Sequence, residues 1–112
     1  MQTTSTVMKN CLLAASLLFS STLLAQTWLT KTAVPAGKHH PISFALNGKG
    51  YAITGTDSTG QPTDGAFEYN PITDSWNALT DFPGLARSYG IGTTANGKAY
   101  LGFGATSSSY LS

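Results

Sequence analysis

Two adjacent histidines, His39 and His40, are the first side chains of this 112-residue sequence to consider for chemistry. Imidazole is a common metal ligand and a proton carrier near neutral pH. Neighbouring residues of one strand, however, point to opposite faces of the sheet, which suits a shared metal ion poorly unless the pair lies on a loop. We therefore expect this pair at the entry to a strand or on the rim of a pore, and we assign no metal ligand to it.

The aspartates also lack the spacing of a catalytic or metal site. The segment GTDSTGQPTDG at 55–65 superficially resembles a calcium loop, but it lacks the alternating acidic positions and the final glutamate. Aspartates in loops do not by themselves provide the carboxylate pair of acid–base catalysis. Since no serine elbow, phosphate loop or zinc spacing occurs either, we predict no catalytic residue, no cofactor and no metal. The four loop aspartates are Asp57, Asp64, Asp74 and Asp81.

Composition favours a folded β-rich domain that does not bind nucleic acid. Only 10% of the residues are charged while 11% are aromatic, the reverse of a disordered tail. Of the six Lys and Arg residues only Lys9 precedes position 26, so five cations face the five acidic residues after that point. Without a basic patch we expect no nucleic-acid partner, and without a basic amphipathic helix no membrane partner for the mature chain.

Residues 1–25 have the pattern of a secretory signal peptide, which is expected to be helical. A polar stretch with Lys9 precedes the uncharged run CLLAASLLFSSTLLA, and Ala25 is a suitable last residue before cleavage. The run is short for a membrane-spanning helix. The single cysteine, Cys11, lies inside it, so the mature chain would contain neither a disulfide nor a reactive thiol. We expect a secreted protein, either extracellular or in the periplasm or at the cell surface.

The remaining sequence repeats with a period near 49 residues. NGKGYAITG at 47–55 returns as NGKAYLGFG at 96–104, where Asn, Gly, Lys, Tyr and the final Gly recur. TWLTKTAVPAG at 27–37 likewise parallels SWNALTDFPG at 75–84. Repeats of this length usually correspond to one supersecondary unit each.

Each period is predicted to contain short strands joined by turns. The strong turn signals are Asn47-Gly48 and Asn96-Gly97, whose residues tolerate positive φ, and the polar NPITD stretch, in which Asn70 and Asp74 are expected to bond the local backbone. Frequent Gly and Pro disfavour helices after the signal peptide. The expected strands cover 42–46, 51–54, 66–69 and 75–79 in the first period, and 87–94 and 100–103 in the second, with a third beginning near the end of the chain.

This pattern resembles the kelch repeat. That family has four strands per period, a Gly pair after the second strand and Tyr and Trp flanking the turn between the third and fourth. Here Thr54-Gly55 and Phe103-Gly104 keep only the second glycine of each pair. The residues that match the motif are Gly55, Glu68, Tyr69, Trp76 and Gly104, together with Trp28, which lies 48 residues before Trp76.

The resemblance implies an all-β propeller in which each repeat forms one blade. Tyr69 and Trp76 would then pack between blades, and 27–30 would be a strand that closes the ring. The implied parts are a signal peptide at 1–25 and a propeller fragment at 26–112, divided into a closing strand at 26–34, a first blade at 38–79 and an incomplete second blade at 87–112. The missing C-terminal blades would be its partners, and alone it should be poorly soluble or partly unfolded.

In such a propeller the segment before the innermost strand lies near the central channel. Either Lys38 or His39 aligns with Arg87 there, depending on a one-residue gap, and structural hydrogen bonding to neighbouring blades is the expected role. The resemblance implies a binding scaffold for a protein or a glycan. The alternative is part of a carbohydrate-active propeller enzyme similar to galactose oxidase or to sialic-acid epimerases, and fold alone does not decide between the two.

Overall fold

The computed structural model describes residues 27–112, so the predicted signal peptide and its helix lie outside the described part of the chain. Lys31–Ser112 forms one compact unit, to which residues 27–30 do not belong. Residues 27–30 are exposed and form no strand. Their role as a strand that closes a ring stays a prediction.

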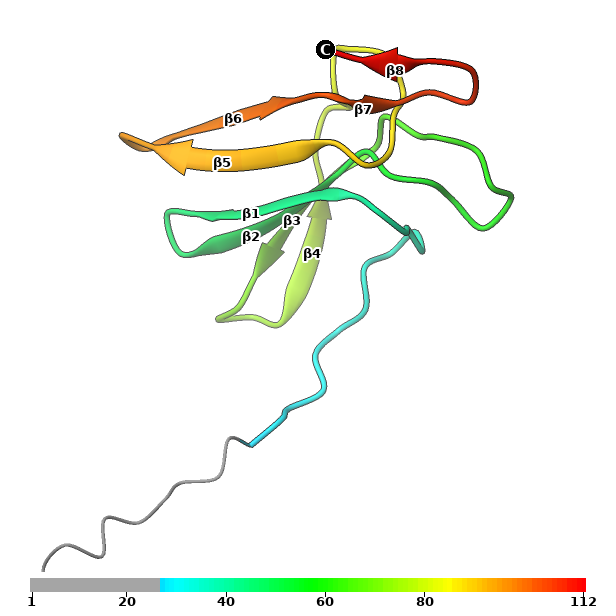
Figure 1. The fold of residues 1–112 in the computed structure, drawn as a ribbon. Helices are drawn as coiled ribbons and strands as arrows, with labels where there is room; N and C mark the ends of the chain where they lie inside the picture. Colours follow the sequence, from blue (N-terminus) through cyan, green and yellow to red (C-terminus); the bar gives the residue numbers. More distant parts are fainter. Residues whose placement is uncertain (1–26) are drawn as a thin grey trace, which may run out of the picture. The chain divides into compact units, whose positions relative to one another are not determined.

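The fold is all-β and its sheets are antiparallel, as predicted (Figure 1). From residue 27 onward no helix is long and apolar enough to cross a membrane. The eight strands within residues 27–112 form a four-stranded sheet in the order β1-β2-β3-β4 and two hairpins, β5-β6 and β7-β8. Their bounds are β1 Ile42–Leu46, β2 Lys49–Ile53, β3 Ala66–Asn70, β4 Ser75–Ala78, β5 Ile91–Ala95, β6 Lys98–Gly102, β7 Gly104–Ala105 and β8 Tyr110–Leu111.

The predicted hairpin turns are confirmed. Asn47 and Gly48 have φ values of 50° and 73°, and Asn96 and Gly97 have 51° and 70°. Two successive left-handed residues make a type I′ turn, whose twist matches that of the flanking strands. As a result β1 pairs with β2 and β5 with β6 in the same register, from Ile42 opposite Ile53 and from Ile91 opposite Gly102.

The predicted strand at 87–94 is wrong at its beginning, because β5 starts only at Ile91. Tyr89 has a φ of 59°, which interrupts the extended backbone. Residues Arg87 and Ser88 instead form single bridges, to Thr63 and to Ala105. The connection before β5 therefore links the two repeats rather than extending a strand.

The two repeats pack together through glycines. Strand β1 lies against β5 and β6 (Figure 1). A Cβ atom on Gly90 would lie 2.5 Å from Ile42 Cδ1, and one on Gly92 would lie 2.7 Å from Ile42 Cγ2. Ile42 is only 1% exposed and forms the core with Ala52, Ile53 and Ala66. Side chains at both glycine positions would separate the sheets, so their absence is what buries Ile42.

Gly55 and Gly104 occupy equivalent positions after the second strand of each repeat. Their φ values are 99° and 104°, and each follows a non-glycine residue, Thr54 or Phe103, with a φ of 60°. A Cβ atom on Gly104 would lie 2.5 Å from the carbonyl oxygen of Ser88. Backbone conformation and a close backbone neighbour therefore both require glycine at this second position.

Candidate functional site

The Tyr and Trp that flank the turn between the third and fourth strands face each other across β3 and β4. Tyr69 is directly opposite Trp76, and their ring centroids are 5.0 Å apart at an angle of 44°. The Tyr69 hydroxyl donates a hydrogen bond of 2.5 Å to Asp74 Oδ1. Trp28, the proposed counterpart of Trp76, is 91% exposed. Packing of these aromatics between neighbouring blades stays a prediction.

Asp74 has a role that sequence reasoning missed. It was expected to bond the backbone of its own turn, as Asn70 does by accepting a 3.0 Å hydrogen bond from the Ile72 amide. Instead its Oδ1 accepts from the Tyr69 hydroxyl and, at 3.0 Å, from the amide of Thr32. The Trp76 indole donates to the Thr32 carbonyl at 2.8 Å. Asp74 and Trp76 thus fasten the distant N-terminal segment to the hairpin.

We predict that this contact makes stability sensitive to acid. Hydrogen bonds, first from the Tyr69 hydroxyl and then from the Thr32 amide, hold the pKa of Asp74 below its usual value. Its stabilising effect is therefore complete above the unfolded pKa of about 3.9 and is lost as pH falls through the lower folded value. Tyr69→Phe should reduce the loss of urea stability between about pH 5 and pH 2, whereas Tyr100→Phe should not change it. Equal acid sensitivity in the two variants would contradict this role for Asp74.

The Glu68 side chain, on β3, has a structural role because it bonds two side chains of β2. Its carboxylate accepts from Lys49 Nζ at 2.8 Å and from the Tyr51 hydroxyl at 2.9 Å. The Lys49 hydrogen bond is the main reason that the pKa of Glu68 is lowered. Tyr51 also stacks on Phe44, with centroids 4.9 Å apart. Every polar group that Glu68 meets lies within its own sheet.

The two histidines form a cluster with Tyr89, which we call the entry-loop cluster (His39, His40 and Tyr89). The expectation that neighbouring histidines face opposite ways is wrong, because His40 has a left-handed φ of 52°. The two Nδ1 atoms are 2.8 Å apart, so one ring donates a hydrogen bond to the other. The His40 ring also stacks on that of Tyr89, with centroids 4.1 Å apart at 25°.

The entry-loop cluster is held by the backbone and is open to solvent. Both of its left-handed residues, His40 and Tyr89, stand just before the first strand of a repeat, and the Tyr89 amide donates to the His40 carbonyl at 3.1 Å. Non-glycine residues with such φ values cost energy and are concentrated at functional sites. Among residues 27–112 no group of three or more His, Cys, Asp or Glu side chains could hold a metal ion.

Lys38, and not His39, is the residue that aligns with Arg87. The bridges between His39 and Thr56 and between Ser88 and Ala105 are equivalent, so Lys38 corresponds to Arg87. Lys38 Nζ donates to Thr63 Oγ1 at 2.5 Å. Burial lowers the pKa of Lys38, and the negative charges of nearby aspartates only partly offset this effect.

The backbone of Arg87 contacts the first repeat, whereas its side chain bonds within the second. Its carbonyl accepts from the Gly55 amide at 2.7 Å. Its guanidinium donates to the Phe103 carbonyl at 3.1 Å and lies 4.9 Å from the centre of the Phe82 ring. Only the backbone contact reaches the other repeat, so the predicted side-chain bonding to neighbouring blades of a propeller stays a prediction.

The calcium-like segment uses its first aspartate to close its own loop. Asp57 Oδ1 accepts from the Thr59 amide at 2.8 Å and from the Gln61 amide at 3.1 Å. The equivalent residue in the second repeat, Thr106, accepts from the amides of Ser108 and Ser109 at 3.2 and 3.0 Å. The same loop therefore forms with an aspartate or with a threonine, as expected for a structural turn.

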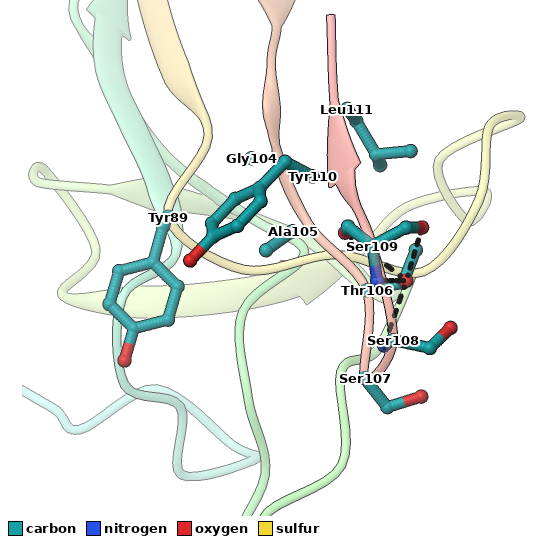
Figure 2. A pocket seen from close by; sticks show the side chains of 9 residues that line it. All are labelled: Tyr89, Gly104, Ala105, Thr106, Ser107, Ser108, Ser109, Tyr110 and Leu111. Atoms are coloured by element: carbon teal, nitrogen blue, oxygen red, sulfur yellow. Dashed lines mark hydrogen bonds between the residues drawn. The ribbon is translucent and has the colours of Figure 1, made fainter.

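An open hollow of about 800 Å³ lies beside Tyr89 and is lined by Gly104–Leu111. Figure 2 shows the side chains of Tyr89 and Tyr110 on one side of the lining and the hydroxyl groups of the 106–109 loop on the other. Tyr89 is 60% exposed and Tyr110 is 95% exposed. Sequence reasoning did not find this hollow, because it is formed by the strand entry of the repeat and by the loop after its second strand.

Comparison with known proteins supports the fold but assigns no family. No protein-family model and no curated protein matches this chain. Among solved structures it is similar to that of YjhT, with a TM-score of 0.67 and 26% sequence identity. The match covers 77% of this chain and 26% of the YjhT chain, so this chain spans about a quarter of that protein's length.

Proposed function

We propose that this chain is part of a secreted kelch-type β-propeller. The support is the repetition of backbone geometry at an offset of 49 residues. Left-handed residues recur at His40 and Tyr89, at Asn47 and Asn96, and at the pairs preceding and including Gly55 and Gly104. Two successive repeats also stack β1 on β5, the arrangement that neighbouring blades need.

Within that architecture we propose a binding role, carried by the entry-loop cluster. His39 and His40 are exposed imidazoles that contact each other, and His40 is further fixed by its stacking on Tyr89. Rigid aromatic groups with free polar atoms provide contact area and hydrogen bonds at a low cost in conformational entropy. The proposed ligand is a glycan or a protein, and the propeller-enzyme alternative rests on the resemblance alone.

An array of immobilised glycans, including galactose- and sialic-acid-terminated chains, tests the binding role. The purified chain should bind a subset of them, and the double variant His39→Ala/His40→Ala should weaken that binding by about tenfold or more. Ile72→Ala is the control, because Ile72 is 92% exposed on the turn between β3 and β4. Equal binding by the double variant, with its circular dichroism spectrum unchanged, would remove the entry-loop cluster from the proposal.

A further inference from the structure

Two nitrogen atoms of the entry-loop cluster are as close to each other as two ligands of one metal ion. His39 Nδ1 and His40 Nδ1 are 2.8 Å apart. Imidazole nitrogen binds a divalent transition metal at about 2.0–2.1 Å, so two adjacent ligand atoms of one ion lie about 3 Å apart. Within residues 27–112 each Nδ1 atom has the other as its hydrogen-bond partner. A metal ion at this point would therefore take the place of the hydrogen bond between the rings.

The backbone brings these two nitrogen atoms together. Both histidines precede β1, which begins at Ile42, so they do not follow the alternation of a strand. His40 has a left-handed φ of 52°, which turns its ring to the side on which the His39 ring lies. A residue with a Cβ pays strain energy for this conformation, and surrounding contacts must offset it.

Contacts from two neighbouring segments hold the pair in place. The His39 amide donates to the Thr56 carbonyl at 2.9 Å, and the His39 carbonyl accepts from the Thr56 amide at 2.9 Å. The His40 carbonyl accepts from the Tyr89 amide at 3.1 Å, and the His40 ring stacks on that of Tyr89. Ligands that are already fixed lose less conformational entropy when an ion binds. The pair is therefore a preformed chelating unit.

We propose that His39 and His40 bind one divalent late transition metal ion, such as Ni²⁺ or Cu²⁺, through their Nδ1 atoms. Imidazole nitrogen suits both ions. No group of three or more His, Cys, Asp or Glu side chains within residues 27–112 could hold a metal ion, so water completes the shell. Those water positions leave the ion open to a donor atom of another molecule. The site uses residues of the binding role proposed above, but it does not depend on a glycan or protein ligand.

Metal binding requires one ring to change its tautomer. In the hydrogen-bonded pair one Nδ1 atom carries a proton, and the other accepts through its lone pair. When the ion binds, both Nδ1 atoms contribute a lone pair. The donating ring therefore gives its Nδ1 proton to water and takes a proton on Nε2, so that two neutral imidazoles remain and no proton is released overall. Both side chains are exposed, which allows this exchange with solvent.

Calorimetric titration of the purified chain with nickel chloride tests this proposal. Every protein in the experiment carries Cys11→Ser, which removes the one thiol of the sequence. The histidine pair should bind one Ni²⁺ ion. His39→Ala and His40→Gly should each weaken this binding by about tenfold or more, because one imidazole alone loses the effect of the linked second ligand. Glycine is used at position 40 because it adopts the φ of 52° without strain.

Ile72→His is the matched control, because it places a single imidazole on a turn where the side chain is 92% exposed. It should leave the binding of the one Ni²⁺ ion unchanged. Two ions bound with equal affinity, each lost with one of the two histidines, would show independent surface imidazoles and overturn the proposal. Nickel binding that survives both His39→Ala and His40→Gly, or no binding at all, would leave the pair as a hydrogen bond only. Since the titration contains no glycan and no partner protein, its failure is distinct from a failure of the glycan array.

Discussion

Replacing Gly90 by alanine is expected to lower the free energy of unfolding by about 3 kcal/mol, a large effect for the addition of one methyl group. The added Cβ would lie 2.5 Å from Ile42 Cδ1, 2.7 Å from Ile42 Cγ1 and 3.1 Å from the Gly102 carbonyl oxygen. Ile42 is only 1% exposed and is enclosed in the core. The repeats must therefore separate or Ile42 must leave its rotamer.

Urea unfolding followed by tryptophan fluorescence measures this effect. Gly102→Ala is the matched control, because a Cβ there would meet no atom within 4 Å and its φ is not left-handed. That variant should differ from the wild type by less than about 1 kcal/mol.

A second substitution distinguishes packing between the repeats from other causes. Ile42→Ala alone should cost about 2–5 kcal/mol, because it leaves a cavity in the core. Combined with Gly90→Ala it should cost less than the sum of the two, since the new methyl group then partly fills that cavity. Additive effects would show that β1 and β5 do not pack through this glycine.

The sequence was sufficient for the elements whose cause is local. Asn47-Gly48 and Asn96-Gly97 predict their hairpin turns, because few other residue pairs adopt two left-handed conformations in succession. The repeated NGK motif places equivalent hairpins 49 residues apart, and their register confirms it. β1 was predicted with its observed bounds, and the other strands of its sheet to within two residues at either end.

Elements with a non-local cause were less predictable. The start of β5 was placed too early, because the apolar and polar pattern of 87–90 reads as a strand although Tyr89 is left-handed. The pairing of Asp74 with Thr32 joins residues 42 positions apart. The left-handed residue that brings the rings of His39 and His40 together is His40 itself, and no glycine or asparagine in the sequence indicates this conformation. The candidate site therefore depended on tertiary contacts that no spacing in the sequence encodes.

Replacing Gly104 by alanine is expected to cost about 4 kcal/mol, because strain and collision act on the same atom. The φ of 104° is one that residues with a Cβ rarely adopt, and the Cβ would lie 2.5 Å from the Ser88 carbonyl oxygen and 3.0 Å from the Gly90 amide nitrogen. Both neighbours are backbone atoms, so no side chain can move aside. The connection before β5, which carries Tyr89, would have to shift.

Gly97→Ala separates the two contributions. Gly97 has a φ of 70° but no atom within 4 Å of the added Cβ, so it carries the strain without the collision and should cost about 1 kcal/mol. Gly55→Ala, whose nearest backbone contacts are 3.1 Å, should lie between the two. We therefore expect the urea midpoint to be lowest for Gly104→Ala, intermediate for Gly55→Ala and highest for Gly97→Ala. Equal losses at Gly104 and Gly97 would mean that conformation alone selects glycine after the second strand, and that the close approach of the Ser88 backbone is not needed to hold the repeats together.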